Sequence, residues 1–217
     1  MPIIVLSPEI VNKIAAGEVV ERPASAAKEL MENSLDAGAR SIEVEVKAGG
    51  LELLRVSDDG AGMTGDEMEL ALQRHATSKI NSYEDLQDIQ SFGFRGEALP
   101  SIASVSRFTM VSRPAGSDSA WQLECRGGEI KSRKQQAAQP GTTVMVEELF
   151  ASVPARRKFL KSQATESRKI AELFLSLALA NPGTGFKLIS EGRVTYDLQS
   201  AKQDDRIKEV LGGELYR

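Results

Sequence analysis

The pattern of apolar and polar residues changes period along the chain, and it predicts a helical start followed by strands. Pro23 suits the first turn of a helix, and apolar residues then recur at helical spacing until Gly38 ends the pattern. The stretch I-E-V-E-V at 42–46 instead alternates apolar and acidic residues, which is typical of a strand with one buried face. Gly49-Gly50 and the apolar run at 51–56 complete the signature of a β-hairpin.

After the hairpin, helices and strands are predicted in mixed order. Thr64 and Glu67 form a capping box for a helix that runs to about Arg74. No long periodic element is convincing between His75 and Gly96, and a glycine-hinged loop of this length is usually a functional lid or disordered. The run Q-Q-A-A-Q-P-G resembles a linker. Further predicted elements are a short helix from Ser7-Pro8 to Gly17, helices at 96–104, 165–180 and 204–211, strands at 107–113, 119–126 and 142–147, and a hairpin at 186–198.

Composition limits the kind of protein without identifying it. The chain has 217 residues, of which 41% are hydrophobic, so it can fill the core of one large domain or two small ones. A formal net charge of −4 argues against a surface that is basic overall, so any contact with a polyanion must be local. The single cysteine, Cys125, and the single histidine, His75, exclude an internal disulfide and Cys-rich or multi-histidine metal sites. Since no apolar run is long enough to span a membrane and no signal-peptide pattern is present, we expect a cytosolic protein, or a nuclear one in a eukaryote.

Residues 56–65, V-S-D-D-G-A-G-M-T-G, contain the G-x-G-x-x-G spacing of dinucleotide-binding turns. The context disfavours that interpretation, because the preceding strand belongs to an antiparallel hairpin and no apolar strand follows before residue 107. Asp58 and Asp59 also stand where a pyrophosphate would approach, and one like-charge pair at about 4 Å costs about 4 kcal/mol at an effective dielectric of about 20. A dinucleotide-binding fold is therefore not expected.

An aspartate just before a glycine turn suits a flat ring that carries an amino group. The carboxylate of Asp58 could accept a hydrogen bond from the exocyclic amine of adenine, where guanine presents an acceptor carbonyl instead. Gly60 and Gly62 would let the backbone lie close to the ring. Taken alone, an ordinary Asp-Gly turn after a strand remains the alternative.

The stretch F-G-F-R-G-E-A-L at 92–99 could hold phosphates. Its glycines and Arg95 come just before a predicted helix, where free backbone N–H groups face an anion. The Walker pattern G-x-x-x-x-G-K-[ST] does not occur in the chain. A glycine-rich entry into a helix, without a ligand, is the alternative.

The predicted helix that begins at Pro23 has an apolar and a polar face. Its apolar face carries Ala27, Leu30, Met31, Ser34 and Leu35, and its polar face carries Glu29, Glu32, Asn33 and Asp36. Glu29 and Asn33 lie one turn apart and could meet one ligand. A glutamate can deprotonate water, and an asparagine oxygen can ligate Mg²⁺ without adding charge beside a triphosphate. A polar face that is simply solvated is the alternative.

Together these stretches resemble the GHKL ATPases, the group that contains DNA gyrase B, the large heat-shock chaperones, sensor histidine kinases and MutL. Within that group the chain is most similar to the MutL family of DNA mismatch-repair ATPases. Seven segments, in family order and over nearly the whole chain, carry the resemblance: I-A-A-G-E-V-V-E-R-P-A-S at 14–25, K-E-L-M-E-N-S-L-D-A-G-A at 28–39, D-D-G-A-G-M at 58–63, R-H-A-T-S-K at 74–79, G-F-R-G-E-A-L at 93–99, G-T-T-V at 141–144 and P-A-R-R-K-F-L at 154–160.

The resemblance implies a Bergerat fold, an α+β architecture in which a mixed, largely antiparallel sheet is covered on one face by helices. ATP would lie between the helices and a mobile lid at about 74–96. By family analogy Glu29 is the general base and Asn33 holds Mg²⁺, while Asp58 reads the adenine amine with help from Thr143. The other ATP-binding residues that the family implies are Gly62, Met63, Thr77, Ser78, Lys79, Gly93, Phe94, Arg95, Gly96, Glu97, Ala98 and Leu99.

The same resemblance implies slow hydrolysis of Mg-ATP to ADP and phosphate, with ATP acting as a switch. Residues 1–20 would be an N-terminal strap, 21–200 the ATP-binding domain, and 201–217 the start of a connection to a second domain that supplies a lysine to the γ-phosphate. In the full-length protein, ATP-driven dimerisation of N-terminal regions would form a clamp on DNA, with a MutS-like mismatch-recognition protein as partner and no membrane. Without the second domain, we expect this chain to be mostly monomeric and a weak or inactive ATPase.

Some features depart from the family pattern or allow a second interpretation. Asp59 stands where bacterial members commonly have asparagine, and Ala151-Ser152-Val153 replaces an aromatic-Asn-Thr segment, which leaves the role of that segment open. The alternative functions are a nucleotide-gated binding module without significant hydrolysis, or another GHKL enzyme of the gyrase B or histidine kinase type. Candidate DNA contacts, which could equally be solvated cations at a helix start, are Arg156, Arg157, Lys158 and Lys161.

Overall fold

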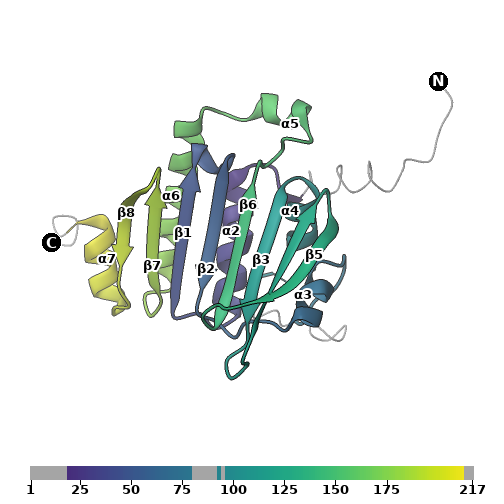
Figure 1. The fold of residues 1–217 in the computed structure, drawn as a ribbon. Helices are drawn as coiled ribbons and strands as arrows, with labels where there is room; N and C mark the ends of the chain where they lie inside the picture. The colour runs from purple at the N-terminus through teal and green to yellow at the C-terminus, as the bar shows by residue number, and fades with distance from the viewer. Residues whose placement is uncertain (1–18, 80–91, 94–95, 213–217) are drawn as a thin grey trace.

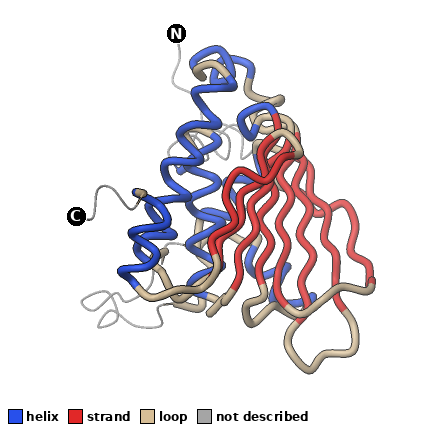
Figure 2. Tube along the Cα trace, turned by 90° about the vertical axis from the view of Figure 1, so that its left-hand side faces the viewer, coloured by secondary structure: helices blue, strands red, loops and turns tan. Residues whose placement is uncertain are grey.

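The fold has two layers, a single twisted sheet and a layer of helices on one of its faces (Figures 1 and 2). The computed structural model describes residues 19–79, 92–93 and 96–212. The helices are α2 (Pro23–Asp36), α3 (Gly65–Ala71), α4 (Ala98–Ser104), α5 (Pro154–Phe159), α6 (Gln163–Ala180) and α7 (Gln203–Leu211), with a short 3-10 turn, η1 (Ala48–Gly50). The strands are β1 (Ser41–Lys47), β2 (Leu53–Asp58), β3 (Arg107–Arg113), β4 (Ala120–Arg126), β5 (Glu129–Gln136), β6 (Gly141–Glu147), β7 (Gly185–Ser190) and β8 (Arg193–Leu198).

The sheet has eight strands in the order β5-β4-β3-β6-β2-β1-β7-β8. Neighbouring strands are antiparallel except β1 and β7, which pair in parallel. The long stretch of chain that connects these two strands includes α6. This mixed, mostly antiparallel sheet with helices on one face confirms the predicted Bergerat architecture. It also confirms that the strand before the glycine turn, β2, lies antiparallel to both of its neighbours, which is incompatible with a dinucleotide-binding βαβ unit.

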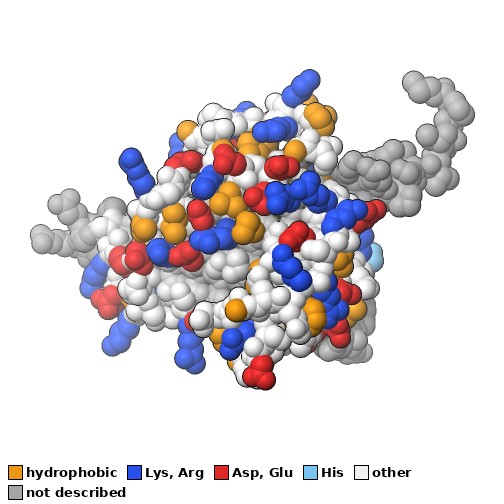
Figure 3. Space-filling model, in the orientation of Figure 1, with side chains coloured by type: hydrophobic (Ala, Val, Ile, Leu, Met, Phe, Trp, Pro, Cys, Tyr) orange, Lys and Arg blue, Asp and Glu red, His pale blue; other side chains and the backbone are white. Residues whose placement is uncertain are grey.

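The β1–β2 hairpin shows how the residue pattern produces the two layers. Ile42, Val44 and Val46 are at most 1% exposed and face the helices. Glu43 and Glu45 point to the opposite, open face of the sheet, where both carboxylates lie 2.9 Å from a guanidinium nitrogen of Arg55. Side chains of both charges are spread over that open face in Figure 3. The open face is therefore balanced in charge and was correctly predicted to be the polar side of the hairpin.

Glycine is required in the turn of this hairpin because the helices pack against it. Gly50 has φ of 84°, and a Cβ there would lie 2.9 Å from Cβ of Pro23 at the start of α2. The turn thereby fixes the N-terminal end of α2 against the sheet. A side chain at this position would push α2 away from β2. It would thereby displace the residues that α2 presents on its other faces.

The core lies between the sheet and the two long helices, α2 and α6. Leu30 and Met31 of α2, and Phe174 of α6, are at most 2% exposed. The ring of Phe174 meets Phe186 of β7 edge to face with centroids 5.6 Å apart. Full burial of each such side chain contributes about 1.5–3 kcal/mol, so these contacts hold α2 against the sheet.

A buried ion pair fixes the entrance of α2 to the start of α6. The Nε and Nη2 atoms of Arg22 donate to the two carboxylate oxygens of Glu166 at 3.0 and 2.9 Å. Glu166 is 1% exposed and also accepts from the backbone N–H of Lys161. The hydrogen bonds that Arg22 donates to Glu166 raise the pKa of Arg22. The N-terminal end of α2 is therefore anchored twice, by the hairpin turn and by this ion pair.

Most predicted elements agree with the structure, and the differences have local causes. The helix predicted to reach Arg74 ends at Ala71, and His75, which donates its N–H to Gly96, has a positive φ of 64° that a helix does not allow. Strand β5 was not predicted, because it is a nearly fully exposed edge strand without apolar alternation, and the supposed linker at 135–141 begins inside it. The predicted helix at 7–17 lies outside the described residues. None of the helices within the described ranges is long and apolar enough to cross a membrane.

Candidate nucleotide-binding site

A large cleft opens between the helix-covered face of the sheet and the helices α2, α3 and α4. Its volume is about 1560 Å³, which exceeds the roughly 300–1,000 Å³ of a typical small-molecule pocket. The floor is apolar and comes from the sheet and α2, with Val56, Met110 and Val144 among its side chains. Polar side chains of the lining form two groups, which we call the two ends of the cleft: one lies around Asp58 at the end of β2, and the other lies on α2 around Asn33.

The carboxylate of Asp58, at the end of β2, is held in a fixed position by three donors. The hydroxyl of Ser34 donates to one oxygen at 2.7 Å, and the backbone N–H groups of Gly60 and Thr142 donate to the other at 3.0 and 3.2 Å. Burial raises the pKa of Asp58, and these three hydrogen bonds only partly oppose that shift. A carboxylate offers about four acceptor positions, so one remains for a donor on a ligand in the cleft.

The glycines after Asp58 are needed for packing against backbone atoms of the protein itself. A Cβ on Gly62, whose φ is 70°, would lie 2.1 Å from the carbonyl oxygen of Arg113. A Cβ on Gly60 would lie 2.9 Å from Cβ of Ala37 at the end of α2. The turn is thus pressed between β3 and α2, and Gly62 and Met63 line the cleft as predicted.

Thr143 does not lie where the sequence prediction placed it. Its hydroxyl donates to the hydroxyl of Ser57 at 3.0 Å, on the open face of the sheet. Its neighbour Thr142 lines the cleft instead, and the hydroxyl of Thr142 is hydrogen-bonded to that of Ser112 at 2.8 Å. Because successive side chains on a strand point to opposite faces, the prediction was off by one residue.

The other end of the cleft is lined by the polar face of α2. Glu29, Asn33 and Asp36 all border the cleft. Glu32, which was predicted on the same face, is not a lining residue; it is 5% exposed and pairs with Lys28 at 2.6 Å.

Lys79 reaches this polar end from the segment that follows α3. Its ammonium donates to Oδ1 of Asn33 at 2.9 Å and to Oδ2 of Asp36 at 2.5 Å. The backbone N–H of Phe92 donates to the other carboxylate oxygen of Asp36 at 3.2 Å. A Cβ on Gly93 would lie 3.5 Å from the Lys79 ammonium and 4.0 Å from a carboxylate oxygen of Glu29, so those two groups flank the same stretch of backbone.

The remaining predicted residues fall into two sets. Phe94 and Arg95 lie outside the described residues. Gly96 has φ of 61°, and a Cβ there would lie 2.4 Å from the carbonyl oxygen of Ala76, so the two segments that border the cleft cross at this glycine. The other predicted residues that line the cleft are Thr77, Ser78, Lys79, Gly93, Gly96, Glu97, Ala98 and Leu99.

The charge of the cleft is strongly one-sided within the described part of the chain. Its described lining contains a single basic side chain, Lys79, and no arginine. The acidic side chains of that lining are Glu29, Asp36, Asp58, Glu67 and Glu97. The described part of the lining is therefore predominantly acidic.

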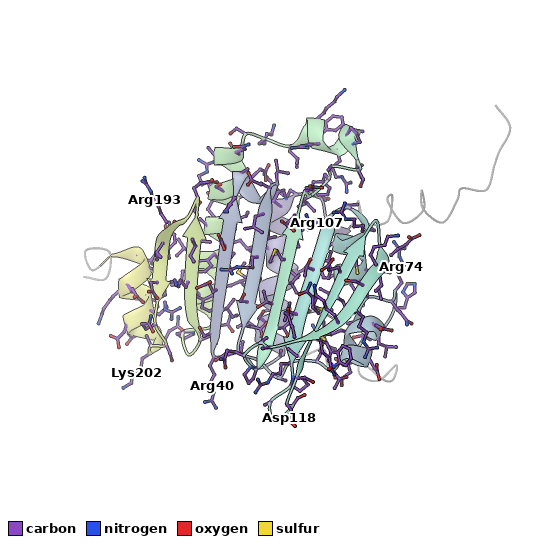
Figure 4. All side chains as sticks on the ribbon, viewed as in Figure 1. Arg40, Arg74, Arg107, Asp118, Arg193 and Lys202 are labelled. Carbon is purple, nitrogen blue, oxygen red and sulfur yellow. The ribbon has the colours of Figure 1, made fainter. Side chains whose placement is uncertain are left out.

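The two departures from the family pattern lie outside the cleft lining. Asp59 turns away and accepts hydrogen bonds from the backbone N–H groups of Arg40 and Ser41 at 2.7 and 2.8 Å. Figure 4 shows Arg40 at the end of the sheet. The hydrogen bonds to Asp59 there stabilise the connection between α2 and β1. Since only oxygen acceptor positions are used, an asparagine could make the same contacts. Ala151-Ser152-Val153 is not among the cleft-lining residues.

The four candidate DNA contacts are divided by the structure. Arg156 donates to the carbonyl oxygen of Val20 at 3.0 Å and its guanidinium lies 5.7 Å from the ring centroid of Phe150. Arg156 therefore has a structural role at the entrance to α2. Arg157, Lys158 and Lys161 are exposed on and just after α5, at the top of the molecule in Figure 1.

Several residues that complete the site were not predicted from the sequence. Ser34, which was placed on the apolar face of α2, orients Asp58, and a lone hydroxyl on an otherwise apolar face was the signal for a buried partner. The sequence contained weaker clues to Asp36 and Thr142. Asp36 was only one of four residues on a polar face, and the side of the sheet on which Thr142 lies depends on strand register.

Comparisons with known proteins agree with this geometry. Residues 21–154 match the family described as histidine kinase-, DNA gyrase B- and HSP90-like ATPase. A DNA mismatch repair protein MutL from Pseudomonas putida is 55% identical over 92% of this chain, and one from Thiobacillus denitrificans is 52% identical over 98% of it. The chain spans 32% and 36%, about a third, of the lengths of these curated relatives.

Solved structures with similar folds come from the same group. A structure described as the Aquifex aeolicus MutL ATPase domain complexed with ADP has a TM-score of 0.72 and is 37% identical, covering 89% of this chain and 70% of the other. The N-terminal domain of a DNA repair protein gives a TM-score of 0.77 at 28% identity, over 93% of this chain and 60% of that one. The chain therefore belongs to the histidine kinase-, DNA gyrase B- and HSP90-like ATPase family, in its MutL branch.

Proposed function

We propose that this chain is the ATP-binding and ATP-hydrolysing N-terminal region of a DNA mismatch-repair protein. The observation that carries the proposal is the carboxylate of Asp58, which is fixed by Ser34, Gly60 and Thr142 above an apolar floor and keeps one acceptor position for a ligand amine. An apolar floor with a few oriented polar groups is the usual form of a site for a flat heterocycle. The relative from Aquifex aeolicus that was solved with ADP supports a nucleotide in this cleft.

The polar end of the cleft supports hydrolysis of the bound nucleotide. Glu29 lies half-buried in the cleft lining, one helical turn from Asn33, and would act as the general base that deprotonates the attacking water. Thr77, Ser78 and the segment from Gly96 to Leu99 line the cleft and would hold the phosphates. Phosphoryl transfer to water depends mainly on such positioning and on neutralisation of charge.

The residues at this end fit a magnesium ion that arrives with the phosphates. Asn33 and Asp36 present oxygen atoms, the ligand type that Mg²⁺ prefers, and they already hold a cation in the form of the Lys79 ammonium. Among the described residues no three or more acidic, histidine or cysteine side chains form a group that could hold a metal ion. Asn33 would hold the ion, which when bound neutralises the charge that develops on the phosphates.

We extend the proposal to the full-length protein by analogy with the family. ATP would favour dimerisation of two N-terminal regions through residues 1–20, which lie outside the described residues, and the dimer would close on DNA. Exposed Arg157, Lys158 and Lys161 are candidates for contact with DNA phosphates. A MutS-like mismatch-recognition protein would be the partner, and the bacterial origin of both curated relatives favours the cytoplasm.

Calorimetric titration with Mg-ATP and Mg-GTP tests the central proposal. The chain should bind ATP more tightly than GTP, and Asp58→Ala should abolish this preference, because the guanine ring carries no amine at the corresponding position. Asp118→Ala, which removes an exposed carboxylate in the β3–β4 loop (Figure 4), should leave both affinities unchanged. Equal affinities of the folded wild-type chain for ATP and GTP would refute the adenine site.

Two alternatives remain distinguishable by experiment. A nucleotide-gated module without significant hydrolysis would respond equally to ATP and to a non-hydrolysable analogue, whereas the position of Glu29 favours hydrolysis. A histidine kinase-like enzyme would transfer phosphate to a protein histidine, and a gyrase B-like one would act on DNA topology. Transfer of the γ-phosphate to water alone would exclude the kinase.

A further inference from the structure

The ammonium group of Lys79 occupies a position that is suited to a metal ion. It lies 2.9 Å from the amide oxygen of Asn33 and 2.5 Å from a carboxylate oxygen of Asp36. The side chains of Lys79 and Asp36 are 21% and 12% exposed, so the pair is largely shielded from water. Two oxygen ligands and partial exclusion of water are also what a hard divalent cation requires.

The contact joins parts of the chain that are distant in sequence. Lys79 and Asp36 are 43 residues apart, and Phe92, whose N–H donates to the second oxygen of Asp36, is 56 residues away from it. Asp36 therefore binds both a side chain and a backbone group from the segments that border the cleft. With a neutral group in place of Lys79, Asp36 would be a nearly buried carboxylate without a compensating charge.

Charge makes the ammonium and a metal ion mutually exclusive at this position. Two cations cannot both lie against Asn33 and Asp36, because their repulsion in a partly buried site is strong. Lys79 is also the single basic side chain in the described lining of an acidic cleft. The Lys79 ammonium can therefore neutralise a bound anion only after it has left Asp36.

We propose that Lys79 is a resident cation, which Asp36 holds beside Asn33 and which a metal–nucleotide complex must displace. This inference rests on the proposed function in that the displacing ligand is taken to be Mg-ATP. Asp36 is thereby a positioning residue: it sets how strongly Lys79 is retained and so how far binding of the nucleotide depends on the metal. When the metal enters, Lys79 is released toward the phosphates.

A metal titration without nucleotide tests the exchange directly. Mn²⁺ is added to the 217-residue chain, and its binding is followed by the electron paramagnetic resonance signal of free Mn²⁺. Lys79→Met should bind Mn²⁺ at least about tenfold more tightly than the wild type, since about 1.4 kcal/mol of competition is removed. Adding Asp36→Asn to that variant should abolish the gain. Lys79→Gln serves as a second variant if Lys79→Met folds poorly.

A matched control comes from the open face of the sheet. Lys187 pairs with Glu43 at 3.0 Å, far from the cleft, and Lys187→Met should leave binding of Mn²⁺ unchanged. Binding of Mn²⁺ to Lys79→Met and Lys79→Gln within about twofold of the wild type would overturn the proposal, because the ammonium would then not compete with a cation.

Nucleotide binding gives a second readout with opposite signs for two variants. In Lys79→Met, the ratio of the Kd of ATP in EDTA to the Kd of ATP in Mg²⁺ should rise about tenfold. This variant lacks the ammonium that could neutralise the phosphates without a metal, and the same ammonium no longer competes with the metal ion. The ratio should fall in Asp36→Asn, because Lys79 is then free to meet the phosphates without a metal. A shift of both ratios in the same direction, or none, would contradict the exchange. Failure of the folded wild type to bind ATP would instead refute the proposed function, and the Mn²⁺ titration would still decide the exchange.

Discussion

The two ends of the cleft each contain an aspartate, and the two aspartates are held in opposite ways. Asp58 accepts from a hydroxyl and two backbone N–H groups, which are all neutral donors. Asp36 accepts from the ammonium of Lys79 and from one backbone N–H. Neutral donors fix a carboxylate without cancelling its charge, whereas an ammonium cancels it. The first end is therefore suited to a neutral amine on a ring, and the second to exchange of cations beside phosphates.

The two ends also differ in how rigidly their residues are held. Asp58, Ser34 and Thr142 lie on β2, α2 and β6, elements that are packed together in the core. Lys79 and Phe92 lie in segments without regular secondary structure, and their contacts to Asp36 depend on charge and a single hydrogen bond. Under the proposed function, the base would be recognised by residues packed in the core, and the phosphates would lie beside segments without regular secondary structure.

The largest effect is expected at Glu29, where hydrolysis of ATP should be lost while binding of ATP is kept. Glu29→Gln removes the base but keeps the shape of the side chain, so hydrolysis of ATP by the full-length protein should fall by about 10²–10⁴-fold. The Kd of Mg-ATP should stay within about twofold, since recognition of the base lies at the Asp58 end. Steady-state phosphate release and calorimetry measure the two quantities. Glu52→Gln, on an exposed residue before β2, is the control, and unchanged phosphate release from Glu29→Gln would remove Glu29 from the mechanism.

A somewhat smaller effect is expected at Asp58. Asp58→Asn turns part of the acceptor into a donor that faces the N–H groups of Gly60 and Thr142, and a hydrogen bond that involves a charged group is worth about 1.5–3 kcal/mol. The affinity for ATP should therefore fall about 10- to 150-fold, measured by calorimetry. Affinity for Mg-GTP should change much less. An equal loss for both nucleotides would mean that the substitution damages the cleft in general.

A paired substitution tests which threonine of G-T-T-V serves the adenine end. Thr142→Val removes a hydroxyl from the cleft and its hydrogen bond to Ser112, and about 1 kcal/mol, or roughly fivefold in the Kd of ATP, should be lost. Thr143→Val, which alters the open face of the sheet, should leave the Kd unchanged. A loss of affinity confined to Thr143→Val would reverse the assignment that the strand register gives.

The smallest effect is the pH dependence that Asp58 confers on stability. Burial raises the pKa of this carboxyl in the folded chain above its ordinary value near 3.8, so the folded state binds the proton more tightly than the unfolded state. Its contribution to stability is fully present below that ordinary value and is lost as the pH rises through the raised one. Urea unfolding at a series of pH values should show a steeper loss for the wild type than for Asp58→Asn.

Two results would bear on that interpretation of Asp58. Parallel stability curves for the wild type and Asp58→Asn would show that the carboxyl is not perturbed. Binding of ATP should respond with the opposite sign, because the adenine amine needs an ionised acceptor. Affinity should therefore decline as the pH falls through the raised pKa of Asp58.

Much of the fold was predictable because its elements are defined by neighbours in sequence. The hairpin at β1 and β2, the boundaries of α2 and the capping box of α3 all agree with the structure within a few residues. Strand β5 escaped prediction because an exposed edge strand needs no apolar alternation. It is held from outside instead, where Arg133 pairs with Asp66 at 2.7 Å and with Glu69 at 2.8 Å of α3 and lies 4.3 Å from the ring centroid of Trp121.

The sequence alone predicted the family from its short motifs and, through that resemblance, the two-layer architecture. Helical and strand periods predicted the hairpin of β1 and β2 and the polar face of α2 that carries Glu29 and Asn33. Only the tertiary structure decided that Thr142 faces the cleft, that Ser34 orients Asp58, and that Lys79 binds Asp36. Each of these depends on strand register or on contacts between residues tens of positions apart. Periodicity along the chain says which face of an element is polar, but not which distant group will meet it, since that follows from how the elements pack.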